Sequence, residues 1–166
     1  MTLTLRFGIL TISDRSSRGE RPDLSGPALQ NAIVTQGWQN NKTAIVPDDI
    51  ETIKNIMIEW ADSREIDILL STGGTGFAPR DVTPEATLLV VDRLTPGFDE
   101  AMRASSMKIT PHAMLSRAVS GIRKQTIIIN LPGSPKAAME NIQVVFPVLE
   151  HAAKLLRNDP DSEMGH

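Results

Sequence analysis

The segment Thr72-Gly73-Gly74-Thr75-Gly76 contains the residue types that can surround a phosphate group. Its glycines tolerate positive φ angles and have no side chains in the way, so backbone N–H groups can close around phosphate oxygens while threonine hydroxyls add donors. The segment is not a P-loop, which needs Lys-Ser or Lys-Thr after its last glycine. Nor is it a dinucleotide fingerprint, because Pro79 stands where another glycine is required. A tight strand-to-helix turn is the structural alternative.

Charged residues that could act on a phosphate follow in two loops. Arg80 can hold a phosphate by a two-pronged contact, and Asp81 can be an oxygen ligand for magnesium or can cap the next helix. Asp48 and Asp49 allow the same two roles, metal ligand or helix cap. One of them could cap a helix at Ile50 and leave the other free to bind a metal ion. Carboxylates from two loops suit metal-assisted nucleotidyl transfer, in which magnesium neutralises charge on the α-phosphate.

Other polar residues allow two interpretations. Glu100 is either a pocket residue or a solvated charge on a helix, and Arg117 after Ser116 either binds phosphate or pairs with a carboxylate. The chain has no cysteine and no Gly-x-Ser-x-Gly elbow, so catalysis by positioning and charge is favoured over a covalent intermediate.

These residues must be positioned by alternating strands and helices. Apolar runs predict strands at residues 5–13, 43–46 and 66–71, and segments 118–123 and 126–131 either pair as a hairpin or lie apart. Helical spacing predicts helices at residues 25–37 with Ser25 as the opening residue, 50–61, 97–107 and 135–156. Another helix is expected with Thr83 as N-cap and Pro84 at its first position.

This order predicts a three-layer α/β/α domain with a mainly parallel, mixed sheet. In such sheets ligands bind at the carboxyl ends of the strands, and every unusual segment follows a predicted strand. These segments are residues 13–15, 47–49, 72–81 and 131–135. Their convergence predicts one site at that edge.

Bulk properties narrow the class of protein further. A length of 166 residues and 40% hydrophobic residues predict one domain over residues 1–157, with residues 158–166 as a disordered tail. The net charge of -3 argues against nucleic acid or an anionic membrane as partners. The absence of cysteine excludes disulfides and sulfur-ligated metals, and we expect a cytoplasmic protein because no signal peptide or spanning segment is recognisable.

At these same segments the chain resembles the molybdopterin adenylyltransferases, called MogA or MoaB in bacteria, and the related G domains of plant and animal molybdenum cofactor proteins. The resemblance covers about residues 5–156. It is carried by Thr11-Ile12-Ser13-Asp14-Arg15, Asp23-Leu24-Ser25-Gly26, Val46-Pro47-Asp48-Asp49, the glycine segment with Pro79-Arg80-Asp81-Val82-Thr83-Pro84-Glu85-Ala86, Ser116-Arg117 and Leu131-Pro132-Gly133-Ser134-Pro135.

The resemblance implies a molybdopterin-binding fold, ATP and molybdopterin as substrates, and assistance by Mg²⁺. It implies that Asp48 and Asp81 are the catalytic or metal-binding residues and that the Gly73 to Gly76 loop contacts the anionic end of the substrate. It also implies a homotrimer and a later transfer of the product to a molybdenum insertion protein. The further pocket residues implied are Ser13, Asp14, Ser25, Gly26, Thr72, Arg80, Glu100, Ser116, Arg117, Pro132, Gly133 and Ser134.

Two other functions are compatible with the same residues. A paralogue or carrier would bind pterin without significant adenylyl transfer, and an unrelated nucleotide-binding enzyme would bind ATP with no preference for pterin. A purely structural role is disfavoured because it leaves the glycine, arginine and carboxylate cluster unexplained.

Overall fold

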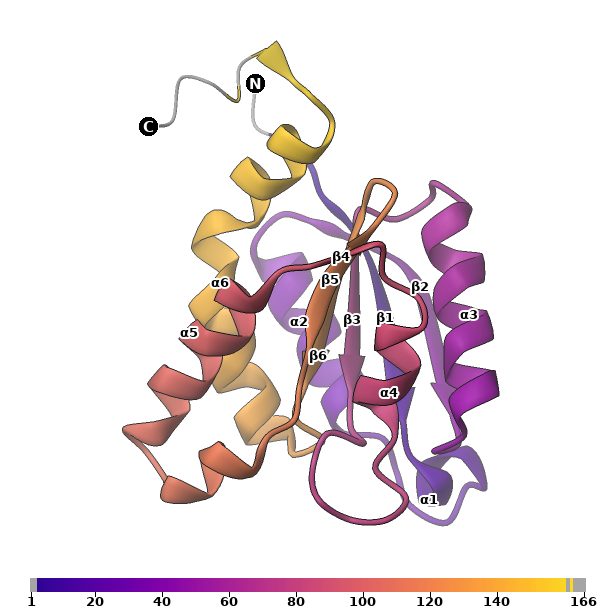
Figure 1. The fold of residues 1–166 in the computed structure, drawn as a ribbon. Coiled ribbons are helices and arrows are strands. Elements are labelled where there is room, and N and C mark those ends of the chain that lie inside the picture. Colours follow the sequence, from indigo (N-terminus) through magenta and orange to yellow (C-terminus); the bar gives the residue numbers. More distant parts are fainter. Residues whose placement is uncertain (1–2, 161, 163–166) are drawn as a thin grey trace.

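A six-stranded mixed sheet forms the centre of the molecule in the computed structural model, which describes residues 3–160 and 162 (Figure 1). The strand order is β2-β1-β3-β6-β5-β4. Strands β2, β1, β3 and β6 are parallel, whereas β5 is antiparallel to both of its neighbours. The strands are β1 (Arg6–Ile12), β2 (Gln39–Val46), β3 (Ile68–Thr72), β4 (Arg93–Leu94), β5 (Ser120–Arg123) and β6 (Thr126–Leu131).

The mainly parallel sheet confirms the predicted fold class, and the hairpin alternative for β5 and β6 is the correct one. The second strand was predicted too short, because it begins at Gln39 rather than Thr43. Its residues alternate between exposed and partly buried along the edge of the sheet. The first residues, Gln39 to Lys42, are polar, so they form no apolar run that would indicate a strand.

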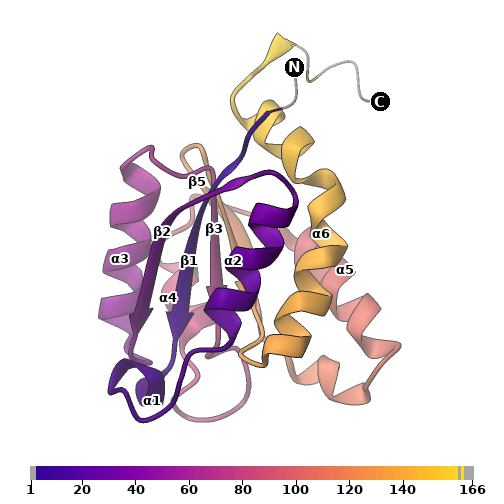
Figure 2. The same cartoon turned by 180° about the vertical axis from the view of Figure 1, so that it is seen from behind.

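Helices cover both faces of the sheet, as Figures 1 and 2 show from opposite sides. Helices α2, α5 and α6 pack on one face through residues such as Leu29, Met102 and Ile142, and α3 and α4 pack on the other through Met57 and Ala86. The helices are α1 (Asp14–Ser17), α2 (Ser25–Thr35), α3 (Ile50–Asp62), α4 (Thr83–Leu88), α5 (Pro96–Met107), the 3₁₀ helix η1 (Pro111–Leu115) and α6 (Pro135–Leu156). The α/β/α layering is therefore confirmed.

The predicted start of α2 at Ser25 is confirmed, whereas the predicted N-cap of α4 at Thr83 is wrong. Ser25 and Thr83 are the first residues of α2 and α4, and Leu24 and Val82 occupy the cap positions without a side-chain hydrogen bond. The hydroxyl of Ser25 donates instead to the Gly133 carbonyl at 2.7 Å, and that of Thr83 donates to the Gly73 carbonyl at 2.8 Å. Both hydroxyls therefore tie a helix start to a neighbouring loop rather than closing their own helix.

The end of the chain is partly described. Helix α6 is one helix of 22 residues that contains Pro147, and its bounds are those predicted. Asn158, in the segment expected to be a disordered tail, donates its N–H to the Leu155 carbonyl at 3.0 Å, and Ser162 is buried. Residues 161 and 163–166 of that segment lie outside the described residues. No helix among the described residues is long and apolar enough to cross a membrane.

Candidate active site

The loops that follow the parallel strands meet at one edge of the sheet, where the arrowheads of β2 and β3 point in Figure 1. They enclose a cavity of about 380 Å³, which we call the polar pocket. Its lining residues are Thr11, Ile12, Ser13, Ser16, Arg21, Pro22, Asp23, Leu24, Ser25, Asp48, Thr72, Gly73, Gly74, Asp81, Gly133, Ser134 and Pro135. The predicted convergence of the loops at the carboxyl edge is therefore present in the structure.

The glycine-rich loop turns its carbonyl groups toward the protein. The Gly73 carbonyl accepts from the Thr83 hydroxyl, the Gly74 carbonyl from the Thr83 N–H, and the Thr75 and Gly76 carbonyls from Arg117. The N–H groups of Gly74, Thr75 and Gly76 have no acceptor within residues 3–160 and 162. Since unpaired backbone N–H groups bind anions, the loop has the polarity of a phosphate-binding loop.

Glycine is required at two positions of this loop. Gly73 and Gly74 have φ angles of +106° and +68°. A Cβ atom at position 73 would overlap the Ile12 carbonyl oxygen, and one at position 74 would overlap the Thr83 hydroxyl and lie 3.1 Å from Asp48 Oδ1. The loop therefore follows the backbone of β1 and the Asp48 carboxylate too closely for any side chain.

Asp49 and Asp48 have different tasks. Asp49 caps α3, because its carboxylate accepts from the Thr52 N–H at 2.9 Å, and this leaves Asp48 to line the polar pocket. Asp48 and Asp14 bind each other reciprocally: the Asp14 N–H donates to Asp48 Oδ2 at 2.8 Å, and the Asp48 N–H donates to Asp14 Oδ1 at 3.0 Å. Two backbone bonds thus fix the orientation of the Asp48 carboxylate.

The environment of Asp48 disfavours its negative charge. Burial raises the pKa of the Asp48 carboxyl, and the nearby charges of Asp14 and Asp81 raise it further, against the opposing effect of the backbone hydrogen bond from Asp14. A bound cation would relieve this repulsion. The oxygen atoms Asp48 Oδ1 and Asp81 Oδ1 accept no hydrogen bond from any described residue.

The carboxylates of the polar pocket suit Mg²⁺ when a bound substrate supplies further oxygen ligands. Among the described residues no group of three or more His, Asp or Glu side chains could hold a metal ion by itself. Mg²⁺ commonly binds to one or two carboxylates, with substrate phosphates and water completing its coordination. Asp48 and Asp81 would supply two such oxygen ligands, provided that a phosphate-bearing substrate supplies others.

The two arginines of the predicted site are engaged by the protein. The Arg80 guanidinium forms a bidentate ion pair with Asp14, with both distances 2.9 Å. Arg117 pairs with Glu85 and donates to the Asp81 carbonyl at 2.7 Å, which confirms the alternative of carboxylate pairing. Both arginines hold loops of the site in place, and neither lines the polar pocket.

A second, more apolar cavity of about 290 Å³ lies on the other side of the glycine-rich loop. We call it the apolar pocket; Thr75, Gly76 and Pro132 belong to it, whereas Gly74 and Gly133 belong to the polar pocket. The remaining lining residues are Asp99, Met102, Arg103, Ser106, Thr110, His112, Ala113, Leu115, Ser116, Ala118, Ala137, Glu140 and Asn141. One loop therefore separates two adjoining pockets.

Asp99 was missed by the sequence prediction, which named its neighbour Glu100. Asp99 is buried, and its carboxylate accepts from the Ser120 N–H at 2.8 Å and the Ser120 hydroxyl at 2.7 Å. Burial raises the pKa of the Asp99 carboxyl despite these bonds. Glu100 is exposed and lines neither pocket. The spacing of Asp99, Met102 and Ser106 along one helical face was the signal that could have identified it.

Most of the other predicted site residues do gather at this edge. Nine line the polar pocket: Ser13, Ser25, Asp48, Thr72, Gly73, Gly74, Asp81, Gly133 and Ser134. Four line the apolar pocket: Thr75, Gly76, Ser116 and Pro132. Five line neither: Asp14, Gly26, Arg80, Glu100 and Arg117. Asp23 was not among the predicted site residues. It holds the start of α2, accepting from the Gly26 N–H at 3.0 Å and from Thr11 Oγ1 at 2.7 Å.

A loop with the polarity to bind phosphate, set between two pockets and beside carboxylates, is typical of α/β proteins with a ligand site at the carboxyl edge of the sheet. Comparison with known proteins gives the family. Residues 8–151 match the family described as "Probable molybdopterin binding domain". The chain belongs to this family, and within it to the MogA/MoaB group of molybdenum cofactor biosynthesis proteins.

Several relatives are similar over nearly the whole chain. The molybdopterin adenylyltransferase of Helicobacter pylori strain J99 is 42% identical over 92% of this chain and 88% of its own length. That of Escherichia coli K12 is 45% identical over 86% of this chain and 74% of its own length. Gephyrin of Dictyostelium discoideum is 46% identical, but this chain spans only 23% of gephyrin.

Solved structures agree with the fold. The molybdopterin biosynthesis enzyme MoaB from Thermus thermophilus superposes with a TM-score of 0.88 and 45% identity, covering 95% of this chain and 99% of its own. The tungsten cofactor synthesizing protein MoaB from Pyrococcus furiosus superposes with a TM-score of 0.84 and 32% identity, covering 93% and 98%.

Proposed function

We propose that this protein transfers the adenylyl group of ATP to molybdopterin, releasing pyrophosphate. The observation that carries the proposal is the glycine-rich loop, whose N–H groups, free among the described residues, lie between an apolar pocket and the polar pocket that contains Asp48 and Asp81. Two substrates placed in the two pockets would bring their phosphate groups together at this loop. The names of the relatives from Helicobacter pylori and Escherichia coli support the same reaction.

The chemistry of the pockets suggests which substrate each holds. The apolar pocket would take the flat pterin ring. Asn141 Nδ2 donates to Ser106 Oγ at 3.1 Å, so these two side chains lie together and would form hydrogen bonds with one edge of the ring. The polar pocket would take the adenylyl part of ATP, with Ser13, Ser25 and Ser134 available as hydroxyl donors or acceptors. Burial of the flat faces of the pterin ring against Met102 and Leu115 would supply affinity, and polar atoms at the edge of the ring would supply orientation.

In the proposed reaction an oxygen of the terminal phosphate of molybdopterin forms a bond to the α-phosphorus of ATP. The bond from that phosphorus to the bridging oxygen of the β-phosphate breaks, and pyrophosphate leaves. The loop N–H groups would hold the phosphates in line, which converts a reaction between two molecules into one within a complex. Asp48 and Asp81 would hold Mg²⁺, which supplies neutralisation of the phosphate charges when bound.

The test is a turnover assay with purified protein, molybdopterin, ATP and Mg²⁺, scoring pyrophosphate and adenylylated pterin. We expect Asp81→Asn to keep the fold and lose at least about a hundredfold in turnover, in the range found when one charge-stabilising group is removed. Asp49→Asn is the matched control, because Asp49 caps α3 outside both pockets, and it should retain turnover. Full activity in Asp81→Asn would contradict the proposed role of this carboxylate.

The assay also separates the alternatives. Tight pterin binding without product would indicate a paralogue or carrier, whereas ATP binding without pterin binding would indicate a different nucleotide-binding enzyme. The proposal extends to a cytoplasmic homotrimer that delivers its product to a molybdenum insertion protein, as the resemblance to the family implies. It includes no nucleic acid and no membrane partner.

A further inference from the structure

A third cavity lies at the opposite edge of the sheet, where β1, β3 and β6 begin. Its volume is about 570 Å³, and neither the loops of the polar pocket nor those of the apolar pocket reach it. Its lining residues are Thr4, Arg6, Ala61, Arg64, Ile66, Asp67, Lys124, Gln125, Thr126 and Arg157. Nothing in the adenylyl-transfer proposal uses this cavity, which we call the basic cavity.

The charge of the basic cavity is opposite to that of the whole molecule. Its lining contains four cations, Arg6, Arg64, Lys124 and Arg157, and the single carboxylate of Asp67, so a surplus of three positive charges remains. Just outside, Asp62 pairs with Arg123 and Lys124, and Glu65 pairs with Lys42, so each carboxylate brings one further cation. Asp92 accepts the Lys124 N–H, and counting its carboxylate lowers the surplus to two. The whole chain carries a net charge of -3.

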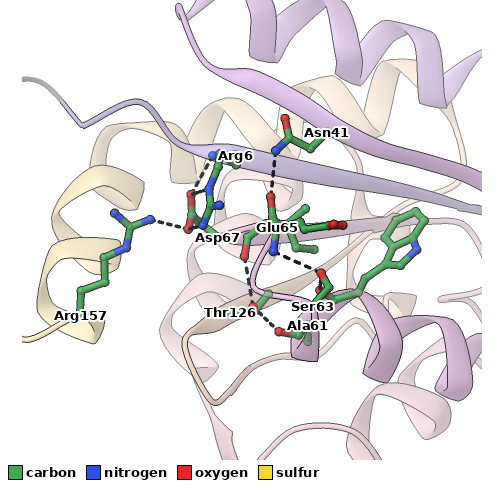
Figure 3. Close-up of polar contacts among 10 residues, drawn as sticks. Arg6, Asn41, Ala61, Ser63, Glu65, Asp67, Thr126 and Arg157 are labelled. Atoms are coloured by element: carbon green, nitrogen blue, oxygen red, sulfur yellow. Dashed lines mark hydrogen bonds and ion pairs between the residues drawn. The ribbon is translucent and has the colours of Figure 1, made fainter.

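The Asp67 carboxylate orients two of these cations but neutralises only one positive charge. Figure 3 shows its carboxylate between Arg6 and Arg157. Arg6 donates its backbone N–H to Asp67 Oδ2 at 2.9 Å and its side chain to both carboxylate oxygens, and Arg157 binds Oδ1. Burial alone would raise the pKa of Asp67, but the bonds from Arg6 and Arg157 outweigh it and the pKa is lowered. One carboxylate therefore orients two guanidinium groups.

The other two cations occupy an unfavourable backbone conformation. Arg64 and Lys124 have φ angles of +60° and +52°, a region that costs about 1 kcal/mol or more for residues other than glycine. Within the part of the chain that the structure describes, the Arg64 side chain has no carboxylate partner, and the Lys124 side chain is 60% exposed. The chain thus carries cations on two turns where glycine would be easier to accommodate.

We propose that the basic cavity binds a small anion carrying a diphosphate group, either inorganic pyrophosphate or the diphosphate of a nucleotide. Guanidinium groups bind phosphate oxygens in pairs, so the oriented Arg6 and Arg157 would hold one phosphate. Arg64 and Lys124, on the facing turns, would hold the other. Ligand binding would relieve the repulsion among the four cations. This site does not depend on the adenylyl-transfer reaction.

The test uses pyrophosphate in a chelator-containing buffer of low ionic strength, followed by calorimetry and by amide chemical shifts. We expect one equivalent to shift the amides of residues 64–67 and 124–126. Arg64→Gln/Lys124→Gln should weaken this binding at least tenfold, because it removes two of the four cations of the basic cavity. Both residues are on exposed turns, so the double variant should keep the core intact. Lys54→Gln/Lys108→Gln removes the same charge outside the cavity and should change the affinity less than twofold.

The outcomes are distinct. Shifts confined to the amides of residues 73–76 would overturn the proposal, since pyrophosphate would then bind only at the carboxyl edge. Equal weakening in the two double variants would also overturn it, because the binding would be diffuse surface attraction. ADP that binds tighter than pyrophosphate would identify a nucleotide as the ligand, whereas equal or weaker ADP binding would identify the inorganic anion. Both of these results support the site, and the wild-type shift map decides the matter even if a variant fails to fold.

Discussion

The carboxylate of Asp48 is placed where its charge is unfavourable for the fold. Its pKa is raised by burial and by neighbouring carboxylates, so the folded protein binds a proton at this group more tightly than the unfolded chain does. The folded state is therefore destabilised once the pH rises above the raised pKa, and this destabilisation is absent below the ordinary range of an aspartate. A functional charge held at a cost in stability is common in active sites.

Asp48→Asn should therefore lose turnover and gain stability. At pH 7 we expect unfolding to require about 0.5 to 1 kcal/mol more than in the wild type, the scale of other favourable charge changes. The asparagine oxygen can still accept the Asp14 N–H. Denaturant titrations at pH 7 and at pH 3.5 measure the effect, which should shrink at the lower pH. A variant less stable than wild type at pH 7 would show that the Asp48 carboxylate supports the fold.

Gly73 is a second residue whose replacement has a defined consequence. Gly73→Ala combines a φ of +106° with an overlap between its Cβ and the Ile12 carbonyl, so we expect a loss of more than about 2 kcal/mol in stability together with a loss of turnover. Gly97→Ala is the matched control. A Cβ at position 97 meets nothing within 4 Å in the first turn of α5, and it should be neutral or slightly stabilising. Similar melting temperatures for the two variants would contradict the described loop geometry.

Sequence reasoning was successful for the residues whose chemistry is local. Glycines after a buried strand indicate a turn with positive φ angles without knowledge of distant contacts, as Gly73 and Gly74 show. The aspartates before α3 indicated a cap but not which of the two forms it, and the structure assigns the cap to Asp49. It was less successful for Arg80 and Ser25. Their partners, Asp14 and Gly133, are 66 and 108 positions away, and only the fold decides that they meet.

At the scale of elements, the apolar periodicity predicted the layers of the fold but not its shortest pieces. Strand β3 is buried along its whole length and was identified by its composition alone. Helix α1 has four residues, none of them buried, and forms where Ser13 accepts from the Ser16 N–H. A helix without an apolar face has no periodic signal, and Ser13 followed by Asp14 was the one local pattern that indicated its start.

Asp62 links two elements that are distant in the sequence, the end of α3 and strand β5, through a partner 61 positions away. Its carboxylate forms a bidentate pair with Arg123, at 2.9 and 3.0 Å, and the Arg123 and Lys124 side chains lower the pKa of Asp62 to about 2. A lowered pKa gives stability that is present above the ordinary value of 3.8 and lost as the pH falls toward about 2.

Asp62→Asn should accordingly destabilise the protein at pH 7 by at most about 1 kcal/mol, because solvent screens this partly exposed pair. The difference between variant and wild type should disappear in the acid range. Urea unfolding between pH 7 and pH 2 measures it, with Glu51→Gln as a control on the exposed start of the same helix. A difference that persisted at pH 2 would assign the effect to packing rather than to charge.

The whole molecule combines two edges of opposite character. At the carboxyl edge Asp23, Asp48 and Asp81 line the pocket beside the glycine-rich loop, and at the amino edge four cations lie around Asp67. The sequence indicated the first edge because the parallel topology gathers all post-strand loops there. It contained no sign of the second, whose cations come from four separate segments between Arg6 and Arg157, each ordinary by itself.

The assembly of the molecule provides the last prediction. Leu88 and Leu89 at the end of α4 and Leu94 on the short edge strand β4 are each at least half exposed, and burial of such apolar side chains against another chain would be favourable. If the chain forms the expected trimer, sedimentation equilibrium should give three times the 18.1 kDa chain mass. Leu89→Lys should shift the protein toward the monomer, because a charge at an apolar contact is costly.

Val148→Lys, on the exposed side of α6, should leave the mass unchanged. Dissociation by the α6 variant alone would place the contact on α6, and a monomeric wild type would exclude the trimer.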